Sequence, residues 1–363
     1  MITFLRDIFA FAAQIIPSPI TLFYKYRFSP ADLDFLAHPL STGRITSSLA
    51  PIDGTKLADA NNNVIATIDI LSYNINDVAV RSTTRTRRTL HAIFSSGADV
   101  ILLQETNPAW KDLLDADAMA LTYPYSHFRH PGVNDRAAGG IAILSRHPLE
   151  NVRIWDFTKH VDGSVFPTLS CQVNVPISLE RSGFSPSDAS GDSSNSFVTI
   201  NIANVHLRPP VELDGSAWFE TARKTEPIRI NEVKELIRNA TSLKADTIMS
   251  ATARPPFNVI AGDFNEGDNA GGLSYLASLG YIDALKQYVP RYKETHTWPF
   301  MRKLFTLRKR LDHIIWHKSQ LLSTVEDECH VKMQCIGCGV LTGYEVDASD
   351  HQPVLARFAL IRV

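Results

Sequence analysis

The sequence has little cysteine, almost no net charge and no uninterrupted apolar segment long enough to span a membrane. Its 363 residues include four cysteines, too few for a scaffold held together by disulfides. A formal net charge of −2 excludes a general polyanion-binding protein, so any contact with nucleic acid must be local. Hydrophobic residues make up 44% and charged residues 20% of the chain, which is typical of a soluble globular protein.

Three of the four cysteines lie close together, in the pattern C-H-x4-C-x2-C formed by Cys329, His330, Cys335 and Cys338. Zinc ligands usually come as two pairs that are further apart and carried by two elements. The spacing therefore favours reduced structural thiols or one disulfide over a zinc site.

The N-terminal region carries no charged residue from Ile8 to Tyr24. A spanning helix needs about 20 apolar residues, and Pro17 and Pro19 interrupt this segment. It is compatible with a helix docked on the domain, with attachment to a membrane interface, or with a signal sequence. The compartment therefore stays open between membrane-associated or secretory and intracellular.

The hydrophobic pattern changes at Val64, which divides residues 1–63, an apolar segment and lead-in, from a main domain at residues 64–363. Alternating or continuous apolar runs predict strands at 64–73, 99–103, 139–145, 168–175, 197–207, 257–262, 311–317 and 351–360. We expect helices at 85–95, 108–118, 220–241 and 271–279, and a solvated loop at 180–196. Because strands outnumber helices and do not alternate with them regularly, we predict mixed sheets with helices outside.

Carboxylates sit at or beside the ends of several predicted strands. Asp263 follows an apolar run in G-D-F-N, Asp312 precedes one in R-L-D-H, and Asp350 precedes one in S-D-H. A buried strand end is a poor place for a carboxylate unless a cation or a hydrogen-bonded partner offsets the loss of hydration. Together these ends predict a metal-centred phosphate site, and the positions from 74 to 351 that contribute to it favour one domain.

Other strand ends are also polar: Asn74 and Asn76 follow the first strand, Glu105 the second, and His206 ends another. Taken singly, the asparagines read as a turn, the glutamate as the partner of an arginine, and the histidine as a structural one.

In chain order, these signals resemble the endonuclease/exonuclease/phosphatase superfamily, which includes nucleases, sphingomyelinases and inositol-polyphosphate phosphatases. The resembling motifs are L-S-Y-N-I-N at 71–76, L-L-Q-E-T at 102–106, G-G-I-A-I-L-S-R at 139–146, N-V-H-L at 204–207, G-D-F-N at 262–265, H-T-W at 296–298, R-L-D-H at 310–313 and S-D-H-Q-P-V at 349–354.

The resemblance implies an α/β fold: a two-layer mixed β-sandwich flanked by helices, that is, a deoxyribonuclease-like four-layer sandwich. It also implies a divalent ion, Mg²⁺ or alternatively Mn²⁺, held mainly by Glu105. Asn74, Asn76 and Asp350 look like further ligands or outer partners, and such hard oxygen donors suit Mg²⁺.

By the same resemblance, Asp263 looks like the base for the attacking water, and Asn265 would hold that water or the phosphate. His351 looks like the donor to a phosphate oxygen, with Asp312 as its carboxylate partner. His206 matches the second histidine of the nuclease and sphingomyelinase branches.

Two positions depart from the superfamily pattern. Asn76 stands where some members carry Asp, so one ligand charge is missing. Asp77 could compensate for it, but a strand that continued through this point would place Asp77 on the other face.

Substrate contacts are less clear from the sequence. Residues Met301 to Arg310 contain five basic residues and no acid, which suggests a surface that follows phosphates. Arg208 could clamp a phosphate oxygen, Trp298 could stack on a base, and Arg310 belongs to the basic stretch.

We therefore expect a metal-dependent phosphoesterase, with a phosphodiesterase or nuclease acting on DNA or RNA preferred. The alternative is a membrane-associated phosphoesterase that acts on a lipid or a small phosphate ester. A catalytically silent binding protein is disfavoured because the set of catalytic residue types is complete. The expected partner is a phosphate-ester substrate, with nucleic acid as one such substrate and a membrane contact through residues 8–24; no protein partner can be inferred.

Overall fold

The computed structural model describes most of the main domain. The described residues are 63–132, 136–177, 196–210, 218–242, 255–268, 270–289, 297–300, 307–318, 321–323, 330–341 and 348–363. The uncharged segment 8–24, nearly all of the loop expected at 180–196, and Cys329 lie outside them, so the predictions for these parts stay predictions. Within the described ranges, no helix is both long and apolar enough to cross a membrane.

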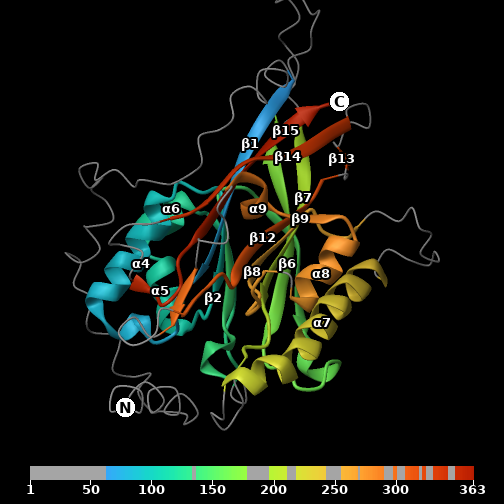
Figure 1. The fold of residues 1–363 in the computed structure, drawn as a ribbon. Coiled ribbons are helices and arrows are strands. Elements are labelled where there is room, and N and C mark those ends of the chain that lie inside the picture. Colours follow the sequence, from blue (N-terminus) through green and yellow to red (C-terminus); the bar gives the residue numbers. More distant parts are fainter. Residues whose placement is uncertain are drawn as a thin grey trace, which may run out of the picture.

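Two sheets form the centre of the fold (Figure 1). The first sheet has the order β13-β14-β15-β1-β2-β4-β3, and the second sheet has the order β5-β6-β7-β8-β12-β9. The strands of the first sheet are β1 Val64–Asn74, β2 Val100–Gln104, β3 Tyr125–Arg129, β4 Ile141–Ser145, β13 Leu321–Ser323, β14 His330–Val340 and β15 Val354–Arg362. Those of the second are β5 Leu149–Asp156, β6 Pro167–Pro176, β7 Phe197–His206, β8 Val259–Asp263, β9 Tyr281–Asp283 and β12 Asp312–His317. A separate hairpin pairs β10 Trp298–Phe300 with β11 Leu307–Lys309.

Helices cover the outer face of each sheet. They are α4 Thr83–Ser95, α5 Pro108–Leu114, α6 Asp117–Thr122, α7 Trp218–Ser242 and α8 Gly271–Ser278, with short 3-10 turns η4 Ala79–Arg81, η5 Ala137–Gly139 and η6 Phe157–Lys159. The short helix α9 Ala284–Tyr288 instead packs into the apolar cluster between the sheets. One apolar cluster joins the first sheet to α4, α5 and α6, and another joins the second sheet to α7 and α8. The four-layer sandwich expected from the sequence is therefore confirmed.

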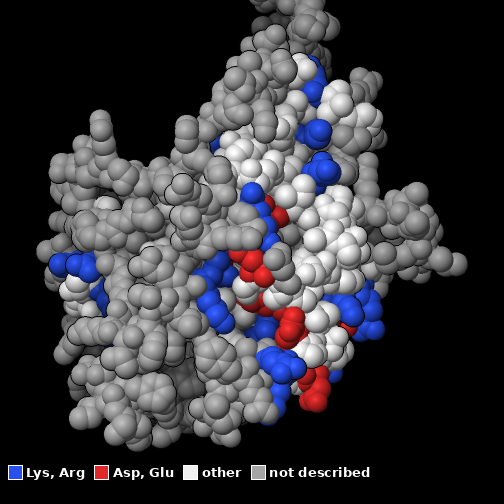
Figure 2. Space-filling model, in the orientation of Figure 1, with Lys and Arg blue, Asp and Glu red and all other residues white. Residues whose placement is uncertain are grey.

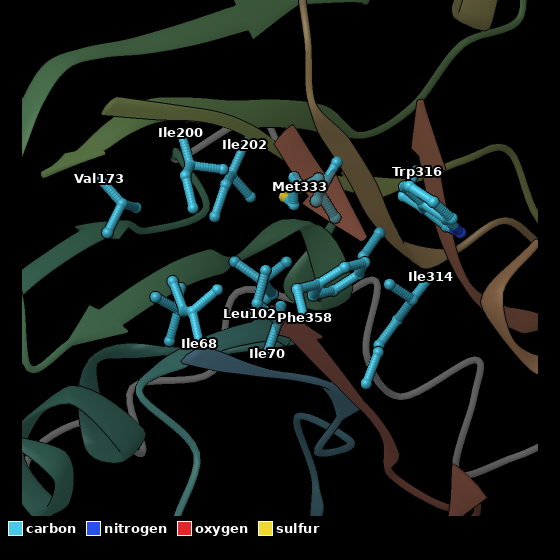
Figure 3. Packing of buried hydrophobic residues seen from close by; sticks show 14 of the residues in the cluster. Ile68, Ile70, Leu102, Val173, Ile200, Ile202, Ile314, Trp316, Met333 and Phe358 are labelled. Atoms are coloured by element: carbon cyan, nitrogen blue, oxygen red, sulfur yellow. The ribbon is translucent and has the colours of Figure 1, made fainter. Parts of the chain in front are cut away.

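The largest apolar cluster lies between the two sheets. Ile68 and Ile70 of β1 point toward the second sheet, where Ile200 and Ile202 of β7 face them (Figure 3). The intervening Leu71 of β1 packs instead against the helices on the outer face. Strand alternation thus fills two cores at once, which explains why β1 is almost continuously apolar.

Strand pairing brings the chemistry-bearing residues to one edge of the sandwich. β1 and β2 run parallel and place Asn74 beside Gln104. In the second sheet, β7 and β8 run parallel with His206 opposite Asp263, and the antiparallel β12 sets Asp312 opposite the same Asp263. Strand register alone therefore collects residues that are far apart in the sequence.

A buried amide network joins the two sheets next to this edge. The Asn204 side chain of β7 donates to the backbone oxygens of Leu103 (3.0 Å) and Ala142 (2.8 Å) in the first sheet. Its own oxygen accepts a hydrogen bond of 2.7 Å from Gln104. Because Asn204 and Gln104 are fully buried, these bonds fix how one sheet lies over the other.

Helix α7 holds the segment that leaves β7. Glu232 of α7 accepts hydrogen bonds from the backbone N–H of Arg208 (2.9 Å) and from the Ser164 hydroxyl (2.5 Å). Arg229, one turn earlier, donates to the backbone oxygen of Arg208 (3.1 Å) and to the Glu266 carboxylate (3.0 Å). The backbone N–H and the backbone oxygen of Arg208 are thus both bound by buried side chains of one helix.

Some elements differ from the sequence prediction. The single helix expected at 108–118 is two helices, α5 and α6, because Ala116 between them has an extended backbone. The strand expected at 351–360 begins only at Val354, which leaves Asp350 and His351 in the preceding loop. Strands β3, β5, β9, β10, β11, β13 and β14 were not predicted.

The cysteines of β14 are reduced. Cys335 and Cys338 are buried free thiols in the core between the sheets, as is Cys171. A register shift between Cys335 and Gly337 marks a bulge that lets both thiols face this core. Reduced structural thiols, one of the two favoured alternatives, are therefore what the described cysteines form.

Replacing Asn204 with Ala is expected to lower the free energy of unfolding by about 2–3 kcal/mol, because the Gln104 amide and two buried carbonyls would lose their partners. Urea denaturation measures this loss. The control is Asn239→Ala on α7, a half-buried position whose amide donates to Glu235 of the same helix, and it should lose less than about 1 kcal/mol. Equal losses in the two variants would contradict a bridging role for Asn204.

Glu232 gives a second prediction, on pH. Burial, only partly opposed by the Arg208 N–H and the Ser164 hydroxyl, raises the pKa of Glu232 from 4.5 to about 7. The folded state therefore binds this proton more tightly than the unfolded state, and stability falls as pH rises from about 4.5 to about 7. Glu232→Gln should remove up to about 3 kcal/mol of this fall between pH 5 and pH 8, measured by urea denaturation. The exposed Glu150→Gln should keep the wild-type slope, and an unchanged slope in Glu232→Gln would refute the assignment.

Candidate active site

The first half of the site is built by the ends of β1 and β2. The Asn74 amide donates to Glu105 Oε1 at 3.0 Å and also to Asp263 Oδ2 of the second sheet at 3.1 Å. Glu105 Oε2 accepts from the backbone N–H of Asp77 at 3.3 Å. Asn74 is thus the direct link between the carboxylates of the two sheets.

The loop before β15 completes this half. Asn76 donates to Asp350 Oδ1 at 2.7 Å, and the indole N–H of Trp298 donates to Asp350 Oδ2 at 3.4 Å. The Ser349 hydroxyl donates to the backbone oxygen of Asn74 at 2.7 Å and thereby ties the loop to the end of β1. The residues predicted as metal ligands, Glu105, Asn74, Asn76 and Asp350, are therefore brought together.

Backbone strain is concentrated in these loops. Among the described residues, four that are not glycine have positive φ, and Asn76 (59°), Glu105 (59°) and Asn265 (52°) are three of them. Such conformations are costly for residues with a side chain and persist where the surroundings enforce them, often at functional sites.

The position of Asp77 follows from a turn. A strand that continued through Asn76 would have placed Asp77 on the opposite face, but β1 ends at Asn74 and the backbone turns at Asn76. Asp77 is instead buried next to Glu105, to which it donates its N–H. It adds a third carboxylate to this half of the site.

The carboxylates of this half have the properties of a cation site. Burial, followed by the charges of Asp77 and Asp350, raises the pKa of Glu105 to about 8. Burial, together with the charge of Asp350 and against that of Arg81, raises the pKa of Asp77 to about 6. A divalent cation would offset this repulsion, and carboxylate and amide oxygens are the ligands that Mg²⁺ and Mn²⁺ accept. The residues present therefore fit a divalent ion such as Mg²⁺ or Mn²⁺.

The second half of the site is a buried histidine between two carboxylates. His351 Nδ1 lies 2.8 Å from Asp312 Oδ2, and its Nε2 lies 3.7 Å from Asp263 Oδ2. Although burial acts against the charged form, Asp312 and Asp263 raise the pKa of His351 well above its ordinary value. His351 is therefore a cation whose free N–H is directed to the site.

Asp263 is a buried carboxylate that contacts both histidines of the site. Burial raises the pKa of Asp263, an effect that His351 opposes and that the nearby Asp312 reinforces. Its Oδ1 accepts from the backbone N–H of Asn265 at 2.8 Å, while Oδ2 faces both histidines of the site. A carboxylate with a raised pKa is well suited to accept a proton from water.

The two histidines of the site differ in charge. His206 Nε2 lies 3.7 Å from Asp263 Oδ2, and the ring of Phe166 stacks on His206 with 4.0 Å between ring centres. Burial, and next the charge of His351, lowers the pKa of His206 to about 3. The 3.7 Å contact is therefore with a neutral imidazole and is not an ion pair.

Backbone contacts fix these groups further. The Asn265 amide donates to the backbone oxygen of Leu207 at 2.9 Å. The hydroxyl of the fully buried Thr297 accepts from the backbone N–H groups of Leu311 (2.9 Å) and Asp312 (3.1 Å). The Thr297 backbone oxygen also accepts from Gln352 at 2.7 Å, so one residue ties the Asp312 strand to the His351 loop.

The three residues predicted to bind substrate have different surroundings. Trp298 is half-buried, with its ring centre 6.4 Å from that of His351. Arg208 is buried directly after β7, next to the His206 motif. Arg310, in contrast, is buried in ion pairs with Asp268 and Asp283, which occupies its guanidinium away from any substrate.

These ion pairs also bear on a second cluster of possible ligands. Asp268, Asp283 and His313 could hold a cation by their spacing, but the Arg310 guanidinium already lies among them. Of the basic stretch 301–310, the structure describes side chains only for Lys309 and Arg310. The remaining basic residues expected to follow phosphates lie outside the described side chains.

Figure 2 shows several Lys and Arg side chains around a small group of Asp and Glu near the middle of the face that it draws. Several residues of this region were not assigned a role from the sequence. Ser349 stands inside the S-D-H motif and Thr297 inside H-T-W, so their motifs were the available signal. Arg229, Glu232 and Glu266 gave none, because charges on a long helix normally read as a solvated face.

We compared the fold with solved structures and the sequence with known protein families. The solved structures that resemble this one include a humanized D. rerio TDP2 with 14 mutations (TM-score 0.50, 16% identity, 80% of this chain and 98% of that one). They also include the human Nocturnin catalytic domain (TM-score 0.51, 16% identity, 82% of this chain and 96% of that one). A third is a functionally unknown conserved protein from Enterococcus faecalis V583 (TM-score 0.50, 14% identity, 80% of this chain and 99% of that one). At these identities the likeness shows the fold alone.

No curated protein sequence matches this one. At the level of families, residues 71–351 match the description "Endonuclease/Exonuclease/phosphatase family", and they contain every predicted metal-binding and catalytic residue. The match spans most of the chain and includes both halves of the site. This chain therefore belongs to the endonuclease/exonuclease/phosphatase family.

Proposed function

We propose that this protein is a Mg²⁺-dependent phosphodiesterase of nuclease type, which cleaves its substrate by attack of water on phosphorus. One observation carries the proposal: Asn74 joins Glu105 to Asp263, so a cation site and a charged Asp312–His351 pair meet at a single point. The cation site would hold a divalent ion. Asp263 and the Asp312–His351 pair would supply the proton acceptor and the proton donor. Metal-assisted hydrolysis of a phosphate ester uses both.

Glu105 and Asp350, with Asn74 and Asn76, would hold the divalent ion. When bound, the ion offsets the negative charge of the phosphate and polarises its phosphorus. Asp77 adds charge next to Glu105 and favours a divalent over a monovalent cation. Mn²⁺ satisfies the same oxygen ligands and is the alternative metal.

The residues of the second half handle the proton and the phosphate. Asp263, whose pKa is raised by burial, accepts a proton from the attacking water. The His351 N–H donates to a phosphate oxygen, and Asp312 keeps the ring oriented and charged. Neutral His206 and Asn265 add hydrogen bonds without adding charge, and Arg208 contributes a fixed cation beside them. Preorganised donors of this kind lower the barrier because they need no rearrangement as charge develops.

The half-buried indole of Trp298 lies at the rim of the site and would stack on a base next to the cleaved bond. This contact favours a nucleic-acid substrate over a phospholipid headgroup. The alternative, a membrane-associated phosphoesterase, depends on residues 8–24, which lie outside the described residues. The two substrates are separated by the assay below.

With Mg²⁺, the purified protein is expected to hydrolyse bis(p-nitrophenyl) phosphate and a single-stranded oligonucleotide, and EDTA should abolish both activities. Asp263→Asn should lower kcat/KM by about 10²–10⁴-fold, because the proton acceptor is lost while size and shape are kept. Release of nitrophenol and gel analysis of the oligonucleotide provide the two measurements.

The exposed Asp115→Asn at the end of α5 is the matched control and should retain the wild-type rate. Full activity of Asp263→Asn would overturn its assignment as the base. Metal-dependent turnover of sphingomyelin without turnover of the oligonucleotide would reject the nuclease and favour the lipid alternative.

Glu105→Gln tests the cation site without using activity. Mg²⁺ should raise the melting temperature of the wild type, since a ligand that binds only the folded state stabilises it. In Glu105→Gln the Mg²⁺ concentration needed for half of this shift should rise at least about tenfold. Without metal, the variant should be as stable as the wild type or more stable, because a repelled carboxylate is removed.

Differential scanning fluorimetry over a range of Mg²⁺ concentrations gives both readings. Glu150→Gln on β5, outside the site, should behave as the wild type in each. A variant that melts lower without metal and still responds normally to Mg²⁺ would show that Glu105 is structural and not a ligand.

A further inference from the structure

His206 is held in a different way from the other histidine of the site. The Nδ1 atom of His351 has a carboxylate partner, Asp312, at 2.8 Å. Among the described residues, no carboxylate takes this place at Nδ1 of His206, whose ring interacts weakly with the backbone of Ala138. The orientation of this ring therefore depends on side-chain packing and on the backbone that carries it.

Phe166 provides the packing. Its ring stacks on that of His206 with 4.0 Å between the ring centres and an angle of 18° between the planes. Both side chains are buried. Phe166 is the last residue of the loop between η6 and β6, the strand that begins at Pro167. The position of this loop therefore decides where the His206 ring can lie.

Helix α7 holds this loop close to itself. A Cβ on Gly163, which has a positive φ of 78°, would come within 2.7 Å of the Ile228 side chain of α7. The next residue, Ser164, donates its hydroxyl to Oε1 of Glu232 at 2.5 Å. Ser164 lies two residues before Phe166, so its bond to α7 fixes the loop close to the stacking ring.

The other oxygen of the same carboxylate holds the segment that follows His206. Glu232 Oε2 accepts from the backbone N–H of Arg208 at 2.9 Å, two residues beyond His206 in the chain. Glu232 is fully buried, and the positive charges of Arg229 and Arg208 lie nearby. Because both of its oxygens are hydrogen-bonded, this carboxylate has one orientation and sets the distance between the two segments.

We propose that Glu232 is a positioning residue for His206: its two oxygens tie the segment that carries His206 to the loop that carries Phe166. The inference rests on the proposed phosphodiesterase function, in which His206 contacts the phosphate. A carboxamide can make the same two contacts, since its oxygen accepts from the Arg208 N–H and its NH₂ group donates to the Ser164 hydroxyl. The role therefore requires the two hydrogen bonds and the shape of the side chain, and not its charge.

NMR of isotope-labelled histidine tests this role without any substrate. Burial, followed by the charge of His351, lowers the pKa of His206 to about 3. The His206 ring signals should therefore stay constant between about pH 5 and pH 8 in the wild type and in Glu232→Gln. In Ser164→Ala and Glu232→Ala, water would reach a less tightly packed ring, so the pKa of His206 should rise toward its ordinary value and the signals should shift within this range. A His206→Gln variant identifies the signals.

Turnover of bis(p-nitrophenyl) phosphate gives a second reading. Glu232→Ala should lower kcat about ten- to hundredfold and change KM less than about threefold, because a displaced donor is lost mainly from the transition state. Glu232→Gln should restore kcat to within about threefold of the wild type. The control is Ser170→Ala on β6, which removes the buried partner of the Trp155 indole and should match the wild type in both readings.

Ser164→Ala removes only one of the two links, so the NMR test stays decisive even where Glu232→Ala does not fold. Unchanged His206 signals in Ser164→Ala, or a loss of kcat in Glu232→Gln equal to that in Glu232→Ala, would overturn the positioning role. Hydrolysis that depends on Asp263 would then leave the proposed function standing. If the wild type does not hydrolyse phosphodiesters, the function is rejected, whereas His206 signals that respond to Ser164→Ala would still support the positioning of the ring by Glu232.

Discussion

A buried imidazole held between two carboxylates is the contact on which the site depends. His351 is a stable cation in the interior only because Asp312 lies 2.8 Å from one ring nitrogen and Asp263 lies near the other. The distance between the two carboxylates is set by strand pairing, since Asp312 and Asp263 are register partners on β12 and β8. A slip of one residue would turn either side chain to the opposite face of its sheet. The chemistry of the site is therefore inseparable from the register of the second sheet.

The rest of the fold protects this register and joins it to the cation site. Thr297 fixes the start of β12 against the His351 loop, and Asn74 connects the carboxylates of the two sheets. Behind them, α7 holds Arg208 from both sides through Arg229 and Glu232. Buried charges of this kind are expensive unless paired, and their number near the site indicates that stability has been exchanged for exact placement of polar groups.

Much of this organisation can be read from the sequence. Polar residues that follow apolar runs, such as Asn74 and Asp263, predicted both the strands and the edge at which they end. The four-layer architecture was predicted through the resemblance carried by these motifs and is confirmed. The edge strand β5 was missed because it is largely polar and exposed, and the interior strand β14 was missed because its glycines and a bulge obscure its alternation.

The remaining differences arise from backbone conformation and from long-range pairing. The side on which Asp77 lies stayed conditional in the sequence analysis, because nothing in the sequence announces a positive φ at Asn76. Arg310 was assigned to substrate because its acidic partners, Asp268 and Asp283, come from loops distant in the sequence. Arg229 and Glu232 look like solvated helix residues until the helix is seen to cover the segment after β7. Pairwise contacts of this type depend on tertiary geometry, which local patterns do not encode.

The Asn204 bridge has a consequence for how the molecule responds to its ligand. Glu105, Asn74 and His351 are carried by the first sheet and its loops, and Asp263 and Asp312 by the second sheet, so these groups stay aligned only while the two sheets keep their relative position. A phosphate that contacts residues of both sheets would connect the sheets at this edge. This connection would add to the hydrogen bonds of Asn204 and Gln104, which join the sheets in the free protein. If a phosphate ester binds in this way, it would stiffen the sandwich at this edge, and a small displacement of one sheet over the other would disturb the site before the protein unfolds.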